Sequence, residues 1–133
     1  MSGETNLQQL IKHMQPMLQP DNYVFVSTKT VNSLDMDKVF ARINEPEGIT
    51  LILTKAQADA WQLPYSSEFS LITLQIHSSL DAVGLTAAFS KALAKNNISA
   101  NVVAGFYHDH ILVAKQDAEK AIETLELLTK QQG

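Results

Sequence analysis

The string His108-Asp109-His110 carries the most reactive side chains of the sequence. Residues two apart on an extended strand share a face, so both imidazoles could join His77 if its strand lies alongside. Two or three imidazoles with a carboxylate form a typical zinc or iron site. A turn at Asp109 would instead point the two rings apart, and strings this short arise readily by chance. We favour a polar hairpin tip, possessing neither a bound metal nor a cofactor.

Nucleophilic catalysis has weaker support. Ser78 and Ser79 follow His77, and His108-Asp109 could supply the base and the orienting acid that a catalytic triad requires. The sequence has no Gly-x-Ser-x-Gly elbow, the turn that exposes a strained serine. We therefore expect structural roles for these residues.

The segment from Ser78 to Gly84 joins an apolar strand to the start of a helix. Backbone N–H groups and the helix dipole favour a carboxylate or phosphate at such a position. Gly84 would allow a ligand to approach the backbone closely, or it would serve only a tight turn. The residues alone leave both interpretations open.

Hydrophobic periodicity predicts the elements that position these residues. Helices are expected over residues 7–14, 54–61 and 81–95 and after Asp117, and strands over residues 23–28, 39–44, 49–54, 69–77, 98–107 and 110–114. Pro16 should end the first helix. The second half then reads β-α-β-β-α and the first half β-β-β-α after its own helix.

The two halves are versions of one unit if residues 31–38 stand where a helix was shortened. We predict an α+β fold of ferredoxin-like βαββαβ type, with a tandem repeat in one compact chain. The expected units are residues 1–66, which include the leading helix, and residues 67–133.

Composition excludes several classes of protein. The chain has 133 residues, 45% of them apolar and 18% charged, with no cysteine, so disulfides and thiolate metal sites are excluded. Its net charge is −4 and Arg42 is its single arginine, which argues against nucleic acid as a partner. No uncharged stretch reaches the ~20 residues of a membrane helix, and the start lacks a secretion signal. We expect a cytoplasmic protein without a membrane partner.

Three stretches resemble the ACT domain, a βαββαβ regulatory module that binds amino acids and other small ligands: residues 84–93, 97–103 and 117–121. The strings Leu63-Pro64-Tyr65, His77-Ser78-Ser79-Leu80 and Phe106-Tyr107-His108-Asp109-His110 resemble a small bacterial family of free-standing tandem ACT-like proteins of unassigned function. That resemblance spans nearly the whole chain.

The resemblance implies a ligand site at the turn between the first strand and the first helix of the second unit, completed by the next strand. Carried over, the turn is Asp81, Ala82, Val83, Gly84, Leu85 and Thr86, and the strand contributes Asn101 and Val102. Asn101 holds a position where amino-acid-binding ACT units often have asparagine. His77, Ser78, Ser79, His108 and His110 are further pocket candidates.

We therefore expect a non-catalytic, homodimeric sensor of a small ligand of amino-acid type. Two alternatives remain open from the sequence. One is a small metal- or His-dependent enzyme using His77, His108 and His110. The other is a pure protein-interaction module.

Overall fold

The computed structural model describes residues 6–75 and 84–131. Their helices and strands follow the order α1 (Leu7–His13), β1 (Gln15–Thr28), η1 (Met36–Lys38), β2 (Ala41–Glu45), β3 (Gly48–Thr54), α2 (Lys55–Ala60), β4 (Phe69–Gln75), α3 (Leu85–Lys95), β5 (Asn101–Ala104), β6 (Asp109–Ala114), η2 (Lys115–Asp117) and α4 (Ala118–Gln131), where η marks a 3-10 helix. Within the described ranges, no helix combines the length and apolar character needed to cross a bilayer.

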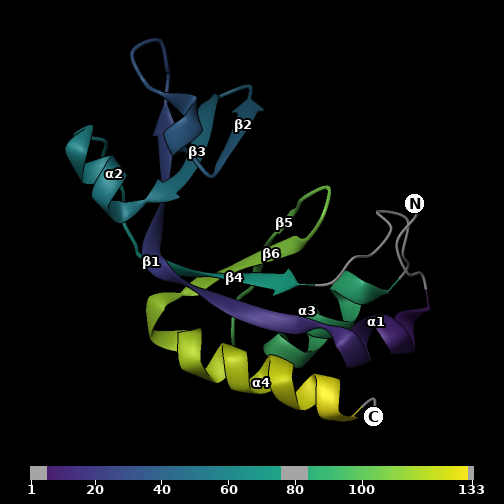
Figure 1. Cartoon of the computed structure of the whole chain (residues 1–133). Helices are drawn as coiled ribbons and strands as arrows, with labels where there is room; N and C mark the ends of the chain where they lie inside the picture. The colour runs from purple at the N-terminus through teal and green to yellow at the C-terminus, as the bar shows by residue number, and fades with distance from the viewer. Residues whose placement is uncertain (1–5, 76–83, 132–133) are drawn as a thin grey trace. The chain divides into compact units, whose positions relative to one another are not determined.

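The strands are hydrogen-bonded in the order β2-β3-β1-β4-β6-β5 (Figure 1). The three strands of the first half of the sequence and the three of the second half follow the same pattern from the middle of the sheet to its edge. β1 is followed outward by the hairpin partners β3 and β2, and β4 by β6 and β5. Both hairpins are antiparallel. Residues 31–38, which contain η1, stand where the second half has α3. This arrangement confirms the predicted α+β tandem fold with a shortened first helix.

The chain packs as two compact units. Pro20–Phe69 form one, which we call the contiguous unit; the described residues up to Gln19 and from Ser70 onward form the other, which we call the helical unit. α1 therefore packs with the second half of the sequence. The predicted division into residues 1–66 and 67–133 describes the two repeats of the sequence and not the two packed units. It stays a prediction.

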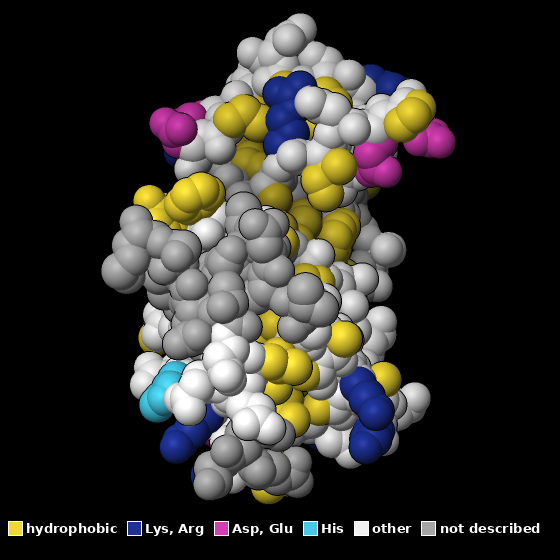
Figure 2. Space-filling view, turned by 90° about the vertical axis from the view of Figure 1, so that its right-hand side faces the viewer, with side chains coloured by type: hydrophobic (Ala, Val, Ile, Leu, Met, Phe, Trp, Pro, Cys, Tyr) yellow, Lys and Arg dark blue, Asp and Glu magenta, His cyan; other side chains and the backbone are white. Residues whose placement is uncertain are grey.

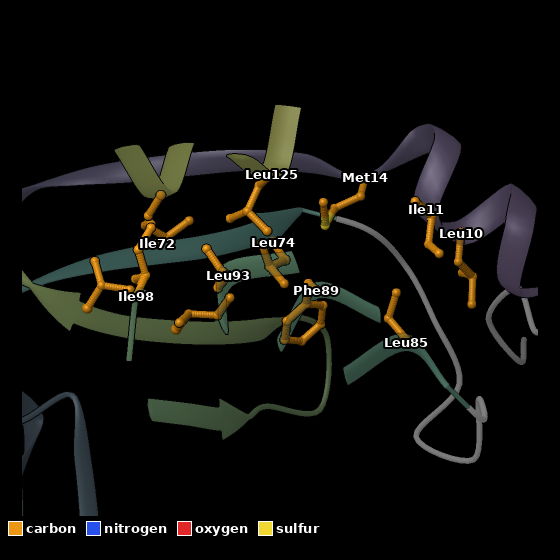
Figure 3. Packing of buried hydrophobic residues seen from close by; sticks show 13 residues of the cluster. Leu10, Ile11, Met14, Ile72, Leu74, Leu85, Phe89, Leu93, Ile98 and Leu125 are labelled. Atoms are coloured by element: carbon orange, nitrogen blue, oxygen red, sulfur yellow. The ribbon is translucent and has the colours of Figure 1, made fainter. Parts of the chain in front are cut away.

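The core of the helical unit lies between its strands and the helices α1, α3 and α4, which cover one face of the sheet (Figure 1). Leu85, Phe89 and Leu93 recur every four residues on α3 and are all buried, as the periodicity predicts. Ile72 and Leu74 of β4 point at them, since alternate strand residues share a face (Figure 3).

The contiguous unit has a smaller core. Its buried residues are Val24, Val26, Leu51, Leu53 and Ala58, from β1, β3 and α2. Thr54 caps α2, because the backbone N–H of Gln57 donates to Thr54 Oγ1 at 3.2 Å. Trp61 and residues of the 31–39 segment pack around this cluster.

Two strands differ most from their predicted lengths, β1 and β5. β1 begins at Gln15, so Pro16 and Pro20 lie inside a strand that was expected only from Tyr23. β3 pairs with β1 from Tyr23 to Thr28. Both prolines precede this stretch. Their missing N–H groups therefore do not interrupt the hydrogen bonds between β1 and β3. β5 covers only Asn101–Ala104, because the residues before it turn the chain out of α3 and residues 105–108 form the hairpin loop, closed by Gly105 N to the His108 carbonyl.

Candidate functional site

Gly84 begins α3 in a backbone conformation that favours glycine. Its φ is +93°, and its carbonyl accepts the N–H of Ala88 at 2.9 Å. No side chain caps the helix at this position. A Cβ on Gly84 would lie 3.1 Å from Leu7 Cδ2, so α1 covers this part of the turn. The glycine thus serves a required conformation and a close contact between α1 and α3.

Of the candidate residues around Gly84, the structure describes only some. Six candidates lie outside the described residues: His77, Ser78, Ser79, Asp81, Ala82 and Val83. Leu85 is buried in the helical core, so only its backbone could face a ligand, whereas Thr86 is exposed in the first helical turn. The described part of the turn therefore offers backbone groups and one hydroxyl.

Asn101 lies at the start of β5 opposite Leu112 of β6. Its Nδ2 donates to the Leu112 carbonyl at 3.2 Å, so its donor side is held by the hairpin. An ammonium group would need the other side of the amide, the acceptor Oδ1. Gly84 and Asn101, the two main candidates for the ligand site, have different neighbours. Leu7 lies next to Gly84, whereas the side chain of Asn101 is hydrogen-bonded to Leu112.

His110 ends a chain of polar side chains that joins three strands of the helical unit. Gln19 Nε2 donates to Thr73 Oγ1 at 3.0 Å, and Thr73 Oγ1 is hydrogen-bonded to His110 Nδ1, also at 3.0 Å. Thr73 is 6% exposed and shares a strand face with buried Leu71. These two hydrogen bonds fix the orientation of the His110 ring on the face of the sheet opposite the helices.

The surroundings of His110 favour its neutral form. Burial lowers the pKa of His110, the positive charge of His108 lowers it further, and Asp109 acts in the opposite direction. Burial raises the pKa of Asp109, with His110 opposing the shift. A neutral imidazole retains one nitrogen that can accept a proton or a hydrogen bond.

His108 belongs to the hairpin loop and His110 to β6, so the two do not share a strand as the metal alternative required. Gly105 N donates to the His108 carbonyl at 2.9 Å, and His110 Nε2 lies 3.4 Å from the position of a Cβ on Gly105. Within residues 6–75 and 84–131, no three His, Asp or Glu side chains gather closely enough to hold a metal ion.

Sequence reasoning missed Gln19 and Thr73 as partners of His110. Thr73 carried a signal, since its hydroxyl lies between the apolar residues Ile72 and Leu74 of a strand. Gln19 carried none, because residues 15–22 were not expected to form a strand. A polar residue between two apolar ones was therefore the signal that could have predicted this hydrogen-bonded row of side chains.

Two hollows lie elsewhere on the units. A groove of about 380 Å³ in the helical unit runs between α3 and α4, with Ala88, Ala92 and Leu128 in its lining and Lys91 and Lys95 beside them. Hydrophobic side chains also reach the surface between basic ones in the lower half of Figure 2.

The second hollow, of about 340 Å³, lies in the contiguous unit. Its lining includes Asp21, Thr54, Lys55 and Asp59. Asp59 is already engaged there: it accepts hydrogen bonds from Tyr65, at 2.7 Å, and from Lys55, at 3.2 Å. Neither hollow is lined by Gly84, Asn101 or His110.

Comparison with known proteins decides the family. Models described as ACT domain match residues 2–70 and residues 66–126 in tandem. The chain belongs to the ACT domain family. A Vibrio cholerae protein of unknown function, described as a "Possible Transport Protein", is similar to this ACT protein at 44% identity and a TM-score of 0.82, with 92% of this chain and 95% of that chain covered.

More distant structures share the fold of this ACT protein. The regulatory subunit of aspartate kinase from Thermus thermophilus matches with 7% identity and a TM-score of 0.59, over 85% of this chain and 95% of that one. Aspartokinase III from E. coli, in complex with aspartate and ADP, matches with 13% identity and a TM-score of 0.61, over 85% of this chain and 32% of that one. No curated protein sequence matches the chain.

Proposed function

We propose that this ACT protein is a non-catalytic regulatory protein that senses a small ligand of amino-acid type. The observation that carries the proposal is the tandem ACT match together with the repeated strand order. Two of the structures with this fold are regulatory subunits of aspartate kinase, an enzyme that acts on an amino acid. This connection supports an amino acid as the ligand class.

The proposed site combines the turn at residues 81–86 with Asn101 and Val102, and with His77, Ser78, Ser79, His108 and His110 as further pocket candidates. Backbone N–H groups at the start of α3 suit a carboxylate, because the helix dipole is positive there. The Oδ1 atom of Asn101 suits an ammonium group, since its Nδ2 is engaged by Leu112.

The alternative enzyme has one supporting observation, the bond between Thr73 Oγ1 and His110 Nδ1. A hydroxyl next to an imidazole is the pair that nucleophilic catalysis uses. Thr73 is, however, only 6% exposed, and its hydroxyl is already engaged by Gln19 and His110, so a substrate would have to displace side chains to reach it. The bond therefore supports a structural chain better than a catalytic pair.

A thermal-shift screen of the amino acids tests the proposal. A ligand that binds only the native state raises stability by RT ln(1 + [L]/Kd), which is about 2.7 kcal/mol at one hundred times Kd. We expect at least one amino acid to raise the melting temperature in a concentration-dependent manner. A screen without any such shift, repeated by calorimetric titration, would contradict the sensing role and favour a pure interaction module.

The site itself is tested with Asn101→Leu, and Asn44→Leu serves as the matched control. Asn44 lies on β2, the outer strand of the other hairpin, and its side chain accepts a hydrogen bond from Arg42. Loss of a hydrogen bond to a charged group is worth about 1.5–3 kcal/mol, or roughly ten- to a hundred-fold in affinity. Equal binding by Asn101→Leu and wild type would place the site elsewhere.

We further propose that the protein acts as a cytoplasmic homodimer. Outer strands of a sheet carry unpaired backbone groups, which natural proteins pair or cover. Sedimentation velocity across a concentration series measures the assembly. A chain that stays monomeric well above micromolar concentration would contradict this part of the proposal and leave the ligand site untouched.

A further inference from the structure

The groove of about 380 Å³ in the helical unit lies between α3 and α4, which pack side by side (Figure 1). Apolar side chains from three helices line it: Ile11 of α1, Ala92 of α3 and Leu128 of α4. A hydrogen bond from Asn96 Nδ2 to Thr124 Oγ1, 2.8 Å long, joins the end of α3 to α4 and bounds the groove there. The groove therefore has an apolar floor and one polar end.

α1 covers only part of the surface that α3 and α4 share. It contacts both helices, and its Ile11 lines the groove. The seven residues of α1 extend over about 10 Å, whereas the fourteen residues of α4 extend over about 21 Å. Leu127 of α4, which also lines the groove, is 57% exposed. Apolar helical surface therefore continues beyond the length of α1.

Two lysines form one wall of the groove. Lys91 and Lys95 are exposed and lie four residues apart on α3, so they project from the same side of the helix. The described residues form one ion pair, Lys55 with Asp59, so neither groove lysine is paired with a described carboxylate. α3 has no acidic residue, and the glutamates of α4 are absent from the described lining. The groove is thus locally basic in a chain whose net charge is −4.

We propose that this groove binds an acidic amphipathic helix of a partner protein. The inference rests on the proposed regulatory role and names the surface through which the protein acts on its target. The apolar stripe of the partner helix packs on the groove floor, and carboxylates four residues apart on its flank lie opposite Lys91 and Lys95. Burial of the apolar stripe supplies most of the affinity, and the complementary charges select the partner.

Three fluorescently labelled synthetic peptides of about 18 residues, long enough to form helices, test the groove by fluorescence anisotropy. The acidic peptide has leucines at i, i+4, i+7 and i+11 and pairs of glutamates four residues apart beside that stripe. The basic peptide has lysines in place of the glutamates. The scrambled peptide has the composition of the acidic one without the leucine stripe. Amino acids are left out of the assay, so it is independent of ligand sensing.

We expect the acidic peptide to bind at least about ten-fold more tightly than the other two, and its affinity should fall as salt is added. Lys91→Glu/Lys95→Glu should reverse the preference in favour of the basic peptide. Leu127→Gln should weaken binding of the acidic peptide, because it removes an apolar contact at an exposed position. Lys29→Glu/Lys38→Glu is the matched control: it makes the same change of net charge at exposed positions of the contiguous unit and should leave the preference unchanged. Far-UV circular dichroism and melting curves verify that each variant is folded.

Three results would overturn the proposal. Equal binding of the acidic and scrambled peptides would show only general charge attraction. An unchanged preference in Lys91→Glu/Lys95→Glu, with undiminished binding by Leu127→Gln, would place the contact outside the groove. Absence of binding by all three peptides would remove the groove as a docking site and leave the amino-acid screen unaffected. A negative amino-acid screen with acid-selective binding intact would instead contradict ligand sensing and support the groove.

Discussion

Replacement of Gly84 by alanine should destabilise the helical unit through the backbone. The φ of +93° at this residue lies in a region that side chains with a Cβ rarely adopt. A residue held in such a region costs of order 1–3 kcal/mol. For a chain of this size, that corresponds to roughly 3–5 °C of melting temperature for each kcal/mol.

The structure separates this backbone cost from a steric one. The added Cβ would lie 3.1 Å from Leu7 Cδ2, which is the far end of a flexible and partly exposed side chain. Leu7 can therefore move aside by a few tenths of an ångström. In a double-mutant cycle of Gly84→Ala with Leu7→Ala, we expect a coupling energy of less than about 0.5 kcal/mol.

Gly84→Asn provides the matched comparison, because asparagine tolerates positive φ better than alanine does. It should cost less than Gly84→Ala although its side chain is larger. A steric origin predicts the reverse order, since the larger side chain would press harder against Leu7.

Denaturant unfolding should be followed with two probes. Trp61, the single tryptophan, packs in the contiguous unit and reports on that unit by fluorescence. Far-UV circular dichroism reports mainly on α3 and α4, the longest helices of the helical unit. Gly84→Ala should lower the midpoint of the dichroism transition. A neutral or stabilising effect of Gly84→Ala would refute the strained conformation, and a coupling above about 1 kcal/mol would refute the backbone origin of its cost.

Two further predictions concern polar groups of the helical unit. The lowered pKa of His110 means that the unfolded chain binds its proton more readily, so the stabilisation is full above the ordinary value of 6.5 and is lost as the pH falls through the lower folded value. Unfolding free energies of wild type and His110→Asn should therefore differ more at about pH 7.5 than at about pH 5.5, and an equal difference at both would contradict this. Thr124→Val should cost about 1 kcal/mol in urea unfolding, because Thr124 is buried and accepts a hydrogen bond from Asn96 at 2.8 Å. Thr129→Val, on the exposed part of the same helix, should be close to neutral, and equal costs would count against the role of burial.

Local patterns predicted most of the elements because their causes are local. The four-residue spacing of Leu85, Phe89 and Leu93 requires only that one helical face be buried. The cap of α2 by Thr54 depends on residues three positions apart. The stop of α3 is similar: Asn97 adopts a φ of +59°, a conformation that asparagine accepts.

Features set by distant residues could not be predicted from these patterns. No residue near Pro16 or Pro20 indicates that β1 extends back to Gln15, beyond the stretch that pairs with β3. The contact of Gly84 with Leu7 and the bond of Thr73 to Gln19 join residues that only the fold brings together. Of the candidate site, the hairpin position of His108 followed from the sequence, whereas the partners of His110 and Asn101 did not.

The discontinuous make-up of the helical unit has a consequence for the order in which a nascent chain can fold. Leu10 and Ile11 are synthesised near the beginning, but they share a core with Ala121 and Leu125, which come last. Pro20–Phe69, by contrast, is complete in one stretch. The contiguous unit can therefore form before α4 has been synthesised, whereas α1 must wait for α4. Closing so long a loop is an entropic cost that slows folding. Pulse-labelled hydrogen exchange during refolding should accordingly find the amides of β1 and β3 protected before those of α1.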